Sequence, residues 1–258
     1  MKRAILSDIH SNLEALQAVL KDFDQEGVAE FYCLGDLVGY GPNPVECIDL
    51  ITKDPRRKIC LLGNHDQAAI FNPAGFNPAA ERAIYWTRRQ LDQSPRSREF
   101  WDFIGELPRS HKDGDFLYVH GSARNPVSEY VFSDDILEKL KMNKLFSIIP
   151  RYCFQGHTHV PGIFTEEGRY FRSSELPDGR YVLGKSDQGD KAEKLMINVG
   201  SVGQPRDKDP RACYVLLDTE TNVIEYRRIP YDSSLTCEKI RDIDELDNFL
   251  GERIKLGR

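Results

Sequence analysis

Polar residues that can bind metal ions follow five separate apolar runs of this 258-residue sequence. The most compact cluster is Gly63-Asn64-His65-Asp66, which comes directly after the apolar run 59–62. The run predicts a buried strand, and the glycine predicts a sharp turn at its end. The clusters after the other four runs contain Asp8, His10, Asp36, His120, His157 and His159. Five of the six histidines lie in these clusters, and only His111 lies elsewhere.

The residue types in the clusters indicate a transition-metal site. Mixed imidazole and carboxylate ligands suit Mn, Fe, Zn, Ni or Co, whereas Mg and Ca prefer oxygen ligands alone. The candidate ligands are Asp8, His10, Asp36, Asn64, His120, His157 and His159. So many ligands suit two ions that share a carboxylate, and two ions about 3.5–4 Å apart can activate a bridging hydroxide for attack on phosphorus. A lone loop histidine is more often a hydrogen-bonded residue, but a group of them at strand ends favours the metal site.

Length and composition narrow the class of protein. The 258 residues fit one domain, or one domain with an appendage, and a hydrophobic fraction of 40% supplies a substantial core. The net charge of -6 predicts no general nucleic-acid binding. We see no signal peptide, and no apolar run is long enough to span a bilayer. The six widely spaced cysteines predict reduced thiols in a cytoplasmic protein.

The first 160 residues alternate between predicted strands and helices. Strands are expected at 4–6, 31–34, 59–62, 116–119 and 152–154, and each leads into one ligand cluster. The intervening helical patterns, such as 13–23, predict a parallel sheet with right-handed crossovers. Residues 68–110 interrupt the alternation with two helical runs, which we interpret as a helical cap or flank beside the site.

The pattern changes after residue 160. Short strands are expected at 162–164, 169–171, 195–198, 213–217 and 223–226, without long helices between them. This arrangement predicts an antiparallel second sheet packed on the first. Residues 173–194 are polar and charged and predict a long exposed hairpin or a partly disordered loop. Residues 234–258 predict one amphipathic C-terminal helix.

Taken together, the clusters resemble the signature motifs of the calcineurin-like metallophosphoesterases. The matching blocks are Asp8-x-His10, Gly35-Asp36, Gly63-Asn64-His65-Asp66, His120-Gly121 and Gly156-His157-Thr158-His159, in the family's order. The resemblance implies a single α/β (α+β) domain over residues 1–258. Its expected architecture is a four-layer sandwich, with two mixed sheets flanked by helices and a helical cap segment. It also implies a hydrolase that uses two divalent or trivalent transition-metal ions, with Mn, Fe, Zn or Ni as candidates.

The family's residue roles carry over to the matching positions. Asp8, His10 and His159 would hold one ion, and Asn64, His120 and His157 would hold the other. Asp36 would bridge both ions. His65 resembles the histidine that contacts the phosphoryl group and can protonate the leaving oxygen. Asp66, which we include as a catalytic candidate, either tunes the pKa of His65 or only shapes the turn, and the second role is slightly favoured.

The second block departs from that of the Ser/Thr protein phosphatases, which continue it as G-D-x-V-D-R-G. Gly39 replaces the aspartate that orients the catalytic histidine, and Tyr40 replaces the phosphate-binding arginine. The chain is more similar to the small bacterial and archaeal phosphodiesterases, including diadenosine-polyphosphate-hydrolase-like members. Arg124 and Arg206 are therefore candidates for binding phosphate, although each is equally well explained as a solvated surface group. Tyr40 would stack on a base or simply cover the core.

The resemblance predicts hydrolysis of a phosphoester or phosphoanhydride bond. We expect a small phosphorylated substrate, either a phosphodiester or a dinucleoside polyphosphate, with a nucleotide as one candidate. The alternatives are a serine/threonine protein phosphatase-like phosphomonoesterase and a non-catalytic scaffold on the same fold. Nothing in the sequence fixes the oligomeric state.

Overall fold

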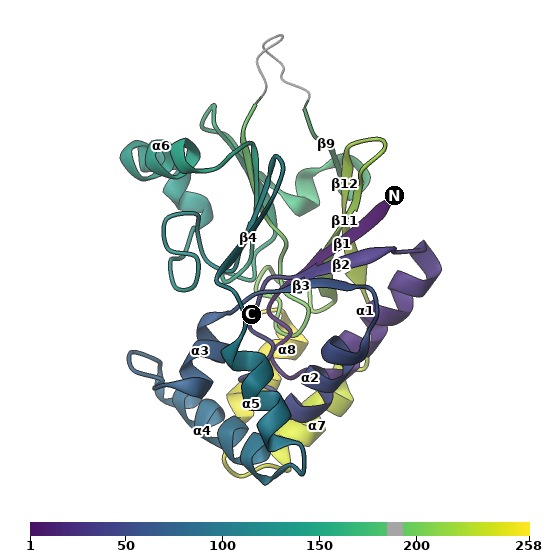
Figure 1. Cartoon of the computed structure of the whole chain (residues 1–258), viewed down its shortest axis with the longest axis vertical. Helices are drawn as coiled ribbons and strands as arrows, with labels where there is room; N and C mark the ends of the chain where they lie inside the picture. The colour runs from purple at the N-terminus through teal and green to yellow at the C-terminus, as the bar shows by residue number, and fades with distance from the viewer. Residues whose placement is uncertain (185–192) are drawn as a thin grey trace.

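The computed structural model describes residues 1–184 and 193–258, which form two packed sheets of six strands each (Figure 1). The first sheet has the order β3-β2-β1-β11-β12-β9. Its strands are β1 (Lys2–Leu6), β2 (Glu30–Cys33), β3 (Arg57–Cys60), β9 (Arg180–Val182), β11 (Ala212–Asp218) and β12 (Val223–Ile229). The strands β1, β2 and β3 are parallel, whereas β11, β12 and β9 pair antiparallel with their neighbours.

The second sheet has the order β4-β5-β6-β10-β7-β8. Its strands are β4 (Ser110–Asp113), β5 (Phe116–Val119), β6 (Tyr152–Gln155), β7 (Gly162–Thr165), β8 (Tyr170–Arg172) and β10 (Leu195–Asn198). Here β5, β6 and β10 are parallel, and the remaining pairings are antiparallel. Each sheet therefore contains three adjacent parallel strands, and the carboxyl ends of five of these six strands, all but β10, lead into the candidate ligand clusters.

Helices cover the outer faces of the sheets and one end of the sandwich (Figure 1). They are α1 (Leu13–Glu26), α2 (Pro44–Lys53), α3 (Asn64–Ile70), α4 (Pro78–Gln93), α5 (Ser97–Gly105), α6 (Lys139–Ile148), α7 (Ser233–Arg241) and α8 (Asn248–Leu256). Short 3₁₀ turns, η1 (Ser133–Leu137), η2 (Ser173–Glu175) and η3 (Pro177–Gly179), complete the elements. Among the described residues, none of the helices has the length and hydrophobicity that a membrane span requires.

The alternation of side chains along β1 accounts for the layers. Ala4 and Leu6 belong to the core cluster that includes Leu16 and Val19 of α1. Ile5 points to the opposite face and joins the cluster between the two sheets. A further cluster joins α6 to the outer face of the second sheet. The predicted four-layer sandwich of two mixed sheets is therefore confirmed.

The predicted antiparallel second sheet is wrong, because the later strands divide between both sheets. Strands β11, β12 and β9 extend the first sheet, while β10, β7 and β8 extend the second. Strand β1 pairs with β2 along one edge, and its other edge pairs with β11 from Lys2 opposite Asp218 to Ile5 opposite Val215. The buried N–H and C=O groups along both edges of β1 need hydrogen-bond partners, and the local sequence does not say which strands supply them. The short polar strand β4 lacks apolar alternation and was not predicted.

Of two further predictions for the later part of the chain, the single C-terminal helix also needs correction. The C-terminal segment forms two helices, α7 and α8, because the side chain of Asp247 caps a second helix by accepting the backbone N–H of Phe249. The segment 173–184 contains exposed residues, as expected for an exposed hairpin or loop, but it is anchored to the fold, since β9 pairs with β12 and Leu176 and Leu183 are buried between the sheets. The rest of that predicted hairpin includes residues 185–192, which lie outside the described residues.

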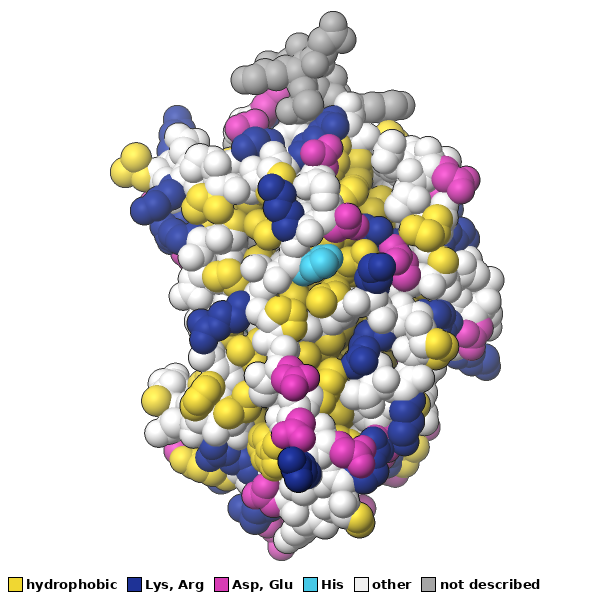
Figure 2. Space-filling model, in the orientation of Figure 1, with side chains coloured by type: hydrophobic (Ala, Val, Ile, Leu, Met, Phe, Trp, Pro, Cys, Tyr) yellow, Lys and Arg dark blue, Asp and Glu magenta, His cyan; other side chains and the backbone are white. Residues whose placement is uncertain are grey.

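The predicted helical cap corresponds to α4 and α5, which lie with α3, α7 and α8 at one end of the sandwich (Figure 1). Phe76, just before α4, places its ring centroid 4.7 Å from that of His65. On the face shown in Figure 2, basic and acidic side chains are interspersed.

Candidate metal centre

The carboxyl ends of the parallel strands meet at one edge of the sandwich. Asp8 follows β1, Asp36 follows β2, and Asn64 begins α3 shortly after β3. From the second sheet, His120 follows β5, and His157 follows β6. A hydrogen bond joins the sheets here, because the backbone N–H of His157 donates to Asp8 Oδ2 at 3.0 Å. Packing of the sheets thus brings together residues that are far apart in the sequence.

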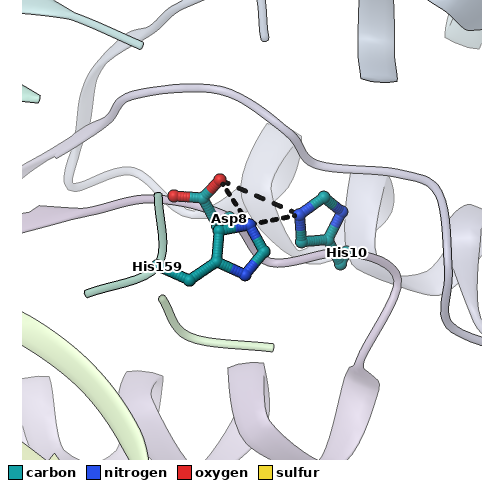
Figure 3. A group of neighbouring side chains, drawn as sticks. All are labelled: Asp8, His10 and His159. Carbon is teal, nitrogen blue, oxygen red and sulfur yellow. Dashed lines mark hydrogen bonds and ion pairs between the residues drawn. The ribbon is translucent and has the colours of Figure 1, made fainter. Parts of the chain in front are cut away.

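Asp8, His10 and His159 form one compact group, which we call the Asp8 triad (Figure 3). The Nε2 atoms of the two histidines lie 3.1 Å apart. Asp8 Oδ1 lies 3.2 Å from Nε2 of His159 and 3.8 Å from Nε2 of His10. The three donor atoms therefore converge on one point, as Figure 3 shows.

Asn64, His120 and His157 form a second group, which we call the Asn64 triad. Nε2 of His120 lies 3.1 Å from Asn64 Oδ1 and 3.1 Å from Nδ1 of His157. Asp36 stands between the triads, because its Oδ2 lies 3.5 Å from Nε2 of His10 and 3.4 Å from Nε2 of His120. All seven predicted ligands are therefore brought together in one cluster.

The donor atoms of the Asp8 triad fit a cation. Nδ1 of His10 lies 3.1 Å from the carbonyl oxygen of Val38, and Nδ1 of His159 lies 2.6 Å from that of Gln204. A carbonyl oxygen only accepts, so each Nδ1 carries the proton and each Nε2 presents a lone pair. These lone pairs face one another beside Asp8 Oδ1, a buried oxygen without a hydrogen bond. Such an arrangement is repulsive unless a positive ion lies among the three atoms.

The backbone around the ligands adopts an uncommon conformation. Asp8, His10, Asp36, His157 and His159 all have left-handed φ angles between 48° and 66°. A left-handed residue other than glycine costs roughly 1–2 kcal/mol, so the surrounding structure must hold these loops in place. Part of this support comes from the end of β10 and the loop after it, where Asn198 Nδ2 donates to the carbonyl oxygen of Gly156 and Ser201 Oγ donates to that of Asp8.

The Gly200–Gly203 loop supports the Asp8 loop and has little backbone left for a phosphate. Three of its N–H groups are already used, since Gly200 donates to Asn198 Oδ1 and Val202 donates to Ser7 O, both at 3.0 Å, and Gly203 donates to Asp8 O at 2.9 Å. A Cβ atom at Gly203 would overlap the carbonyl oxygen of Ile9, so this close approach requires glycine.

Asp66 is fully buried and accepts backbone N–H groups from two turns. Its carboxylate oxygens accept from Asp36, Leu37, Val38 and Gly63 at 2.8–3.2 Å. Burial and the nearby charge of Asp36 raise the pKa of the Asp66 carboxyl to about 7, while the bonds from Gly63 and Val38 favour its ionised form. These contacts are those of a residue that shapes the turn around Asp36.

His65 is held by neighbouring rings and by its backbone. Its ring centroid lies 4.4 Å from that of Tyr40 and 4.7 Å from that of His10, and its backbone N–H donates to Asp36 Oδ1 at 2.8 Å. Gly39 has a φ of +89°, and a Cβ atom there would overlap Nδ1 of His65. That nitrogen is buried and has no hydrogen-bond partner. Packing, rather than a side chain at position 39, therefore positions the ring.

Burial and nearby carboxylates together set the pKa values of the site histidines. Burial lowers the pKa of His157 to about 3, aided by the charge of His120. Burial also lowers the pKa of His65 to about 4, with a further contribution from the Arg206 guanidinium. Burial opposes the charged form of His120 as well, but the carboxylates of Asp36 and Asp8 outweigh it and raise the pKa of that ring to about 9. His65 is therefore neutral at pH 7 in the free protein.

The predicted substrate-binding residues have different surroundings. Arg124 is ion-paired with Glu129, and none of its hydrogen bonds reaches a predicted ligand. Arg206 lies close to the centre, with its guanidinium carbon 5.8 Å from the Tyr40 ring centroid. Tyr40 is only 8% exposed and is surrounded by His10, His65 and Arg206, which favours its covering role over base stacking.

Sequence reasoning did not assign Tyr130 and Phe132 to the site. The Tyr130 ring stacks on that of His157, with centroids 3.7 Å apart and an interplanar angle of 17°. Phe132 continues the stack at 5.2 Å from Tyr130, and both aromatic rings are partly exposed. Their position next to a histidine cluster becomes visible only when the loop after β5 is placed beside β6.

The fold and these motifs place the chain among known proteins. Residues 1–222 match the model of the calcineurin-like phosphoesterase superfamily domain, and the chain belongs to this superfamily. An uncharacterized protein of Methanocaldococcus jannaschii is 37% identical over 99% of this chain and 98% of its own length. The crystal structure of a metallophosphoesterase from Sphaerobacter thermophilus is 35% identical, covers 100% of this chain and 99% of its own, and superposes with a TM-score of 0.81.

A more limited similarity concerns a symmetrical bis(5'-nucleosyl)-tetraphosphatase of Dechloromonas aromatica. It is 26% identical over 116 residues, which are 45% of this chain and 41% of that protein. The superfamily is one of metal-dependent phosphoesterases, and the clustered histidines and carboxylates of this chain could bind metal. The chain therefore belongs to a hydrolase superfamily, and its clustered side chains are of types that could bind metal.

Proposed function

We propose that the protein hydrolyses a phosphoester or phosphoanhydride bond with two transition-metal ions, one in each triad. The observation that carries this proposal is the position of Asp36, whose Oδ2 lies within 3.5 Å of both His10 Nε2 and His120 Nε2. A carboxylate between two converging donor groups suits two ions that share one ligand. Bound ions would supply a nucleophile from water at neutral pH and neutralise charge on the phosphoryl oxygens. Mn, Fe, Zn and Ni remain the candidates for this donor set.

The protein's own residues would bind and orient the phosphoryl group. Asp8, His10 and His159 would hold one ion, Asn64, His120 and His157 the other, and Asp36 both. Arg206 would contribute positive charge beside the centre, in preference to Arg124, which is paired with Glu129. Asp66 would keep Asp36 in place through its hydrogen bonds to the turn.

His65 would contact the phosphoryl group and protonate the leaving oxygen. The ring packs against His10 of the Asp8 triad and is held between Tyr40 and Phe76. Its low pKa in the free protein requires that the negative charge of a bound phosphoryl group raise it, because a nearby opposite charge favours the imidazolium form. His65 also falls into a possible ligand group with His10 and Asp36, so its role has to be tested by metal content as well as by activity.

We infer a small phosphodiester or a dinucleoside polyphosphate as the substrate. The limited similarity to a symmetrical bis(5'-nucleosyl)-tetraphosphatase supports a nucleotide. The partly exposed Tyr130 and Phe132 rings beside His157 offer a face on which a base could stack. A protein phosphatase is less well supported, because Gly39 and Tyr40 stand where that class has aspartate and arginine.

The test is an activity panel on purified protein reconstituted with Mn, Ni, Zn or Fe. The substrates are bis-p-nitrophenyl phosphate, p-nitrophenyl phosphate, diadenosine tetraphosphate and a phosphopeptide. We expect turnover of the diester or the dinucleotide to exceed that of the other substrates. A preference for the phosphopeptide would replace the proposal with the protein phosphatase. No turnover despite two bound ions per chain would indicate a scaffold.

We also propose that residues 1–258 form a single domain and that the protein works in the cytoplasm. All six cysteines are buried and free of disulfides, which supports a reducing compartment. Expression of the full chain with a fluorescent tag in its native host would test the location.

A further inference from the structure

A pocket of about 560 Å³ lies next to the proposed metal centre. Its walls come from the turn after His159, from the end of β8 and the turn after it, from the 206–209 loop and from β12. This volume is within the range of small-molecule sites, which is about 300–1,000 Å³. None of the proposed metal ligands lines the pocket, so it is a separate compartment.

Arg206 links this pocket to the metal centre. Arg206 lines the pocket, while its guanidinium lies beside the Tyr40 ring. Its backbone N–H donates to the carbonyl oxygen of His159 at 3.2 Å. The pocket wall also includes Val160 and Pro161, which directly follow His159, and Ser133, which directly follows Phe132. A ligand bound at the centre could therefore continue past Arg206 into the pocket.

The lining of the pocket is basic, although the whole chain has a net charge of -6. It contains Arg172, Arg206, Lys208, Arg211 and Arg228 against Asp178, Asp207 and Asp209, so five positive and three negative groups leave a net charge of +2. Two of the arginines are neutralised, because Arg228 pairs with Asp207 and Arg211 pairs with Asp209.

The other cations have no such partner. Within the described part of the chain, no carboxylate lies within ion-pair distance of Arg172, Arg206 or Lys208. The backbone beneath Lys208 is fixed, since its N–H donates to the carbonyl oxygen of Gly257 after α8 at 2.8 Å. Hydroxyl groups of Ser133, Ser173 and Ser174 add further polar groups to the lining. The pocket thus combines unpaired positive charge with hydroxyl groups in a preformed cavity.

We propose that this pocket binds a second phosphate group of the substrate, remote from the phosphorus that is attacked. Guanidinium and ammonium groups with adjacent hydroxyls recognise phosphate oxygens through charge-assisted hydrogen bonds. The substrate is then a compound with at least two phosphate groups, such as a polyphosphorylated nucleotide, and not a simple diester. This inference rests on the proposed function, and it assigns new binding roles to Arg172 and Lys208.

The kinetic test compares a substrate with several phosphates and a substrate with one. The kcat/KM for diadenosine tetraphosphate is divided by that for bis-p-nitrophenyl phosphate in the wild type, Lys208→Met and Arg172→Gln. Because each variant removes one charged contact with the remote phosphate, we expect the ratio to fall about tenfold in each, mainly through KM. The matched control is Lys112→Met. Lys112 lies on the edge strand β4 of the second sheet, whereas Arg172 lies on β8 at the other edge of that sheet, so the ratio in Lys112→Met should equal that of the wild type. Equal ratios in all four proteins would overturn the proposal.

A binding measurement separates this inference from the proposed catalytic function. The full chain is freed of metal with EDTA and titrated calorimetrically with sodium tripolyphosphate. We expect one site, with affinity about tenfold lower in Lys208→Met and unchanged in Lys112→Met. If the metal-loaded wild type turns over no substrate but binds tripolyphosphate in this pattern, the catalytic proposal fails and the anion pocket stands. If the wild type hydrolyses the diester but binds no tripolyphosphate, the pocket proposal fails alone.

Discussion

The two triads differ in how firmly the protein holds them. All three residues of the Asp8 triad have left-handed backbone, and each is at most 2% exposed. Both of its histidines are fixed by carbonyl oxygens on the far side of the ring. In the Asn64 triad only His157 has left-handed backbone, and Asn64 is partly exposed. One of its two histidines also has outer support, since Nε2 of His157 lies 3.3 Å from the carbonyl oxygen of Ser128, but Nδ1 of His120 is buried without a partner.

This difference suggests a division of labour between two otherwise similar donor groups. Hydrogen bonds to the outer ring nitrogen orient a histidine ligand and raise its affinity for metal. We therefore propose that the Asp8 triad is prearranged for an ion. In the Asn64 triad the partly exposed Tyr130 ring covers His157, and we propose that an ion there would exchange more readily. The following predictions test how far the two groups share a single centre and how far they differ.

The largest effect is expected for Asp36→Asn, which removes the charge between the triads. Both ions should bind more weakly, and turnover of bis-p-nitrophenyl phosphate should fall by more than about 10³-fold, because several kcal/mol of charge stabilisation are lost. Metal content by mass spectrometry and steady-state kinetics measure the two effects. The control is Asp24→Asn, an aspartate whose side chain is 72% exposed. Full activity in Asp36→Asn would remove the bridging role and with it the idea of one shared centre.

A smaller loss of activity is expected when one candidate ligand is removed from a single triad. His10→Ala and Asn64→Ala should each retain about one ion per chain, with activity at least about 100-fold lower. In the wild type, stepwise chelation should release the ion of the Asn64 triad first. The ion that remains should be the one that is lost in His10→Ala and kept in Asn64→Ala. His111→Ala, the histidine outside the cluster, serves as the control. Simultaneous release of both ions would mean that the triads do not differ in affinity.

His65→Ala separates chemistry from metal binding. We expect two ions per chain and a rate lower by about 10²- to 10⁴-fold for a substrate with a poor leaving group, since general acid catalysis contributes about that much. The loss should be much smaller for p-nitrophenyl esters, whose leaving group needs little protonation. Gly39→Ala should show the same pattern, because the added Cβ atom would displace the His65 ring. Loss of an ion in His65→Ala would instead place this residue among the ligands.

The smallest effect is expected at Tyr130, which covers the Asn64 triad. An aromatic pair is worth about 0.5–1.5 kcal/mol, so Tyr130→Ala should weaken the more labile ion by at most about tenfold. Tyr130→Phe keeps the stack on His157 and should bind metal like the wild type. Metal titration followed by competition with a chromogenic chelator measures both variants. An equal loss in the Phe variant would assign the effect to the hydroxyl group and not to stacking.

Much of the fold was predictable because the chain marks its strands locally. The runs before Asp8, Asp36, Asn64, His120 and His157 all overlap strands of the structure, although β3 (Arg57–Cys60) begins and ends two residues before the expected strand 59–62. The pattern did not reveal how β11 and β12 join β1, since apolar runs look alike whichever strand they pair with. The break between α7 and α8 was also missed, because apolar residues continue at helical spacing across the turn.

The sequence by itself determined which side chains could bind metal and where along the chain each one follows a strand. Only the tertiary structure decided that lone pairs of His10 and His159 face one another, that Asp66 bonds to the turn around Asp36, and that Arg206 lies between the candidate metal centre and a basic pocket. The reason is physical. Residue type and local spacing fix the chemistry of a donor, whereas contacts between the two sheets fix its orientation and its charged neighbours.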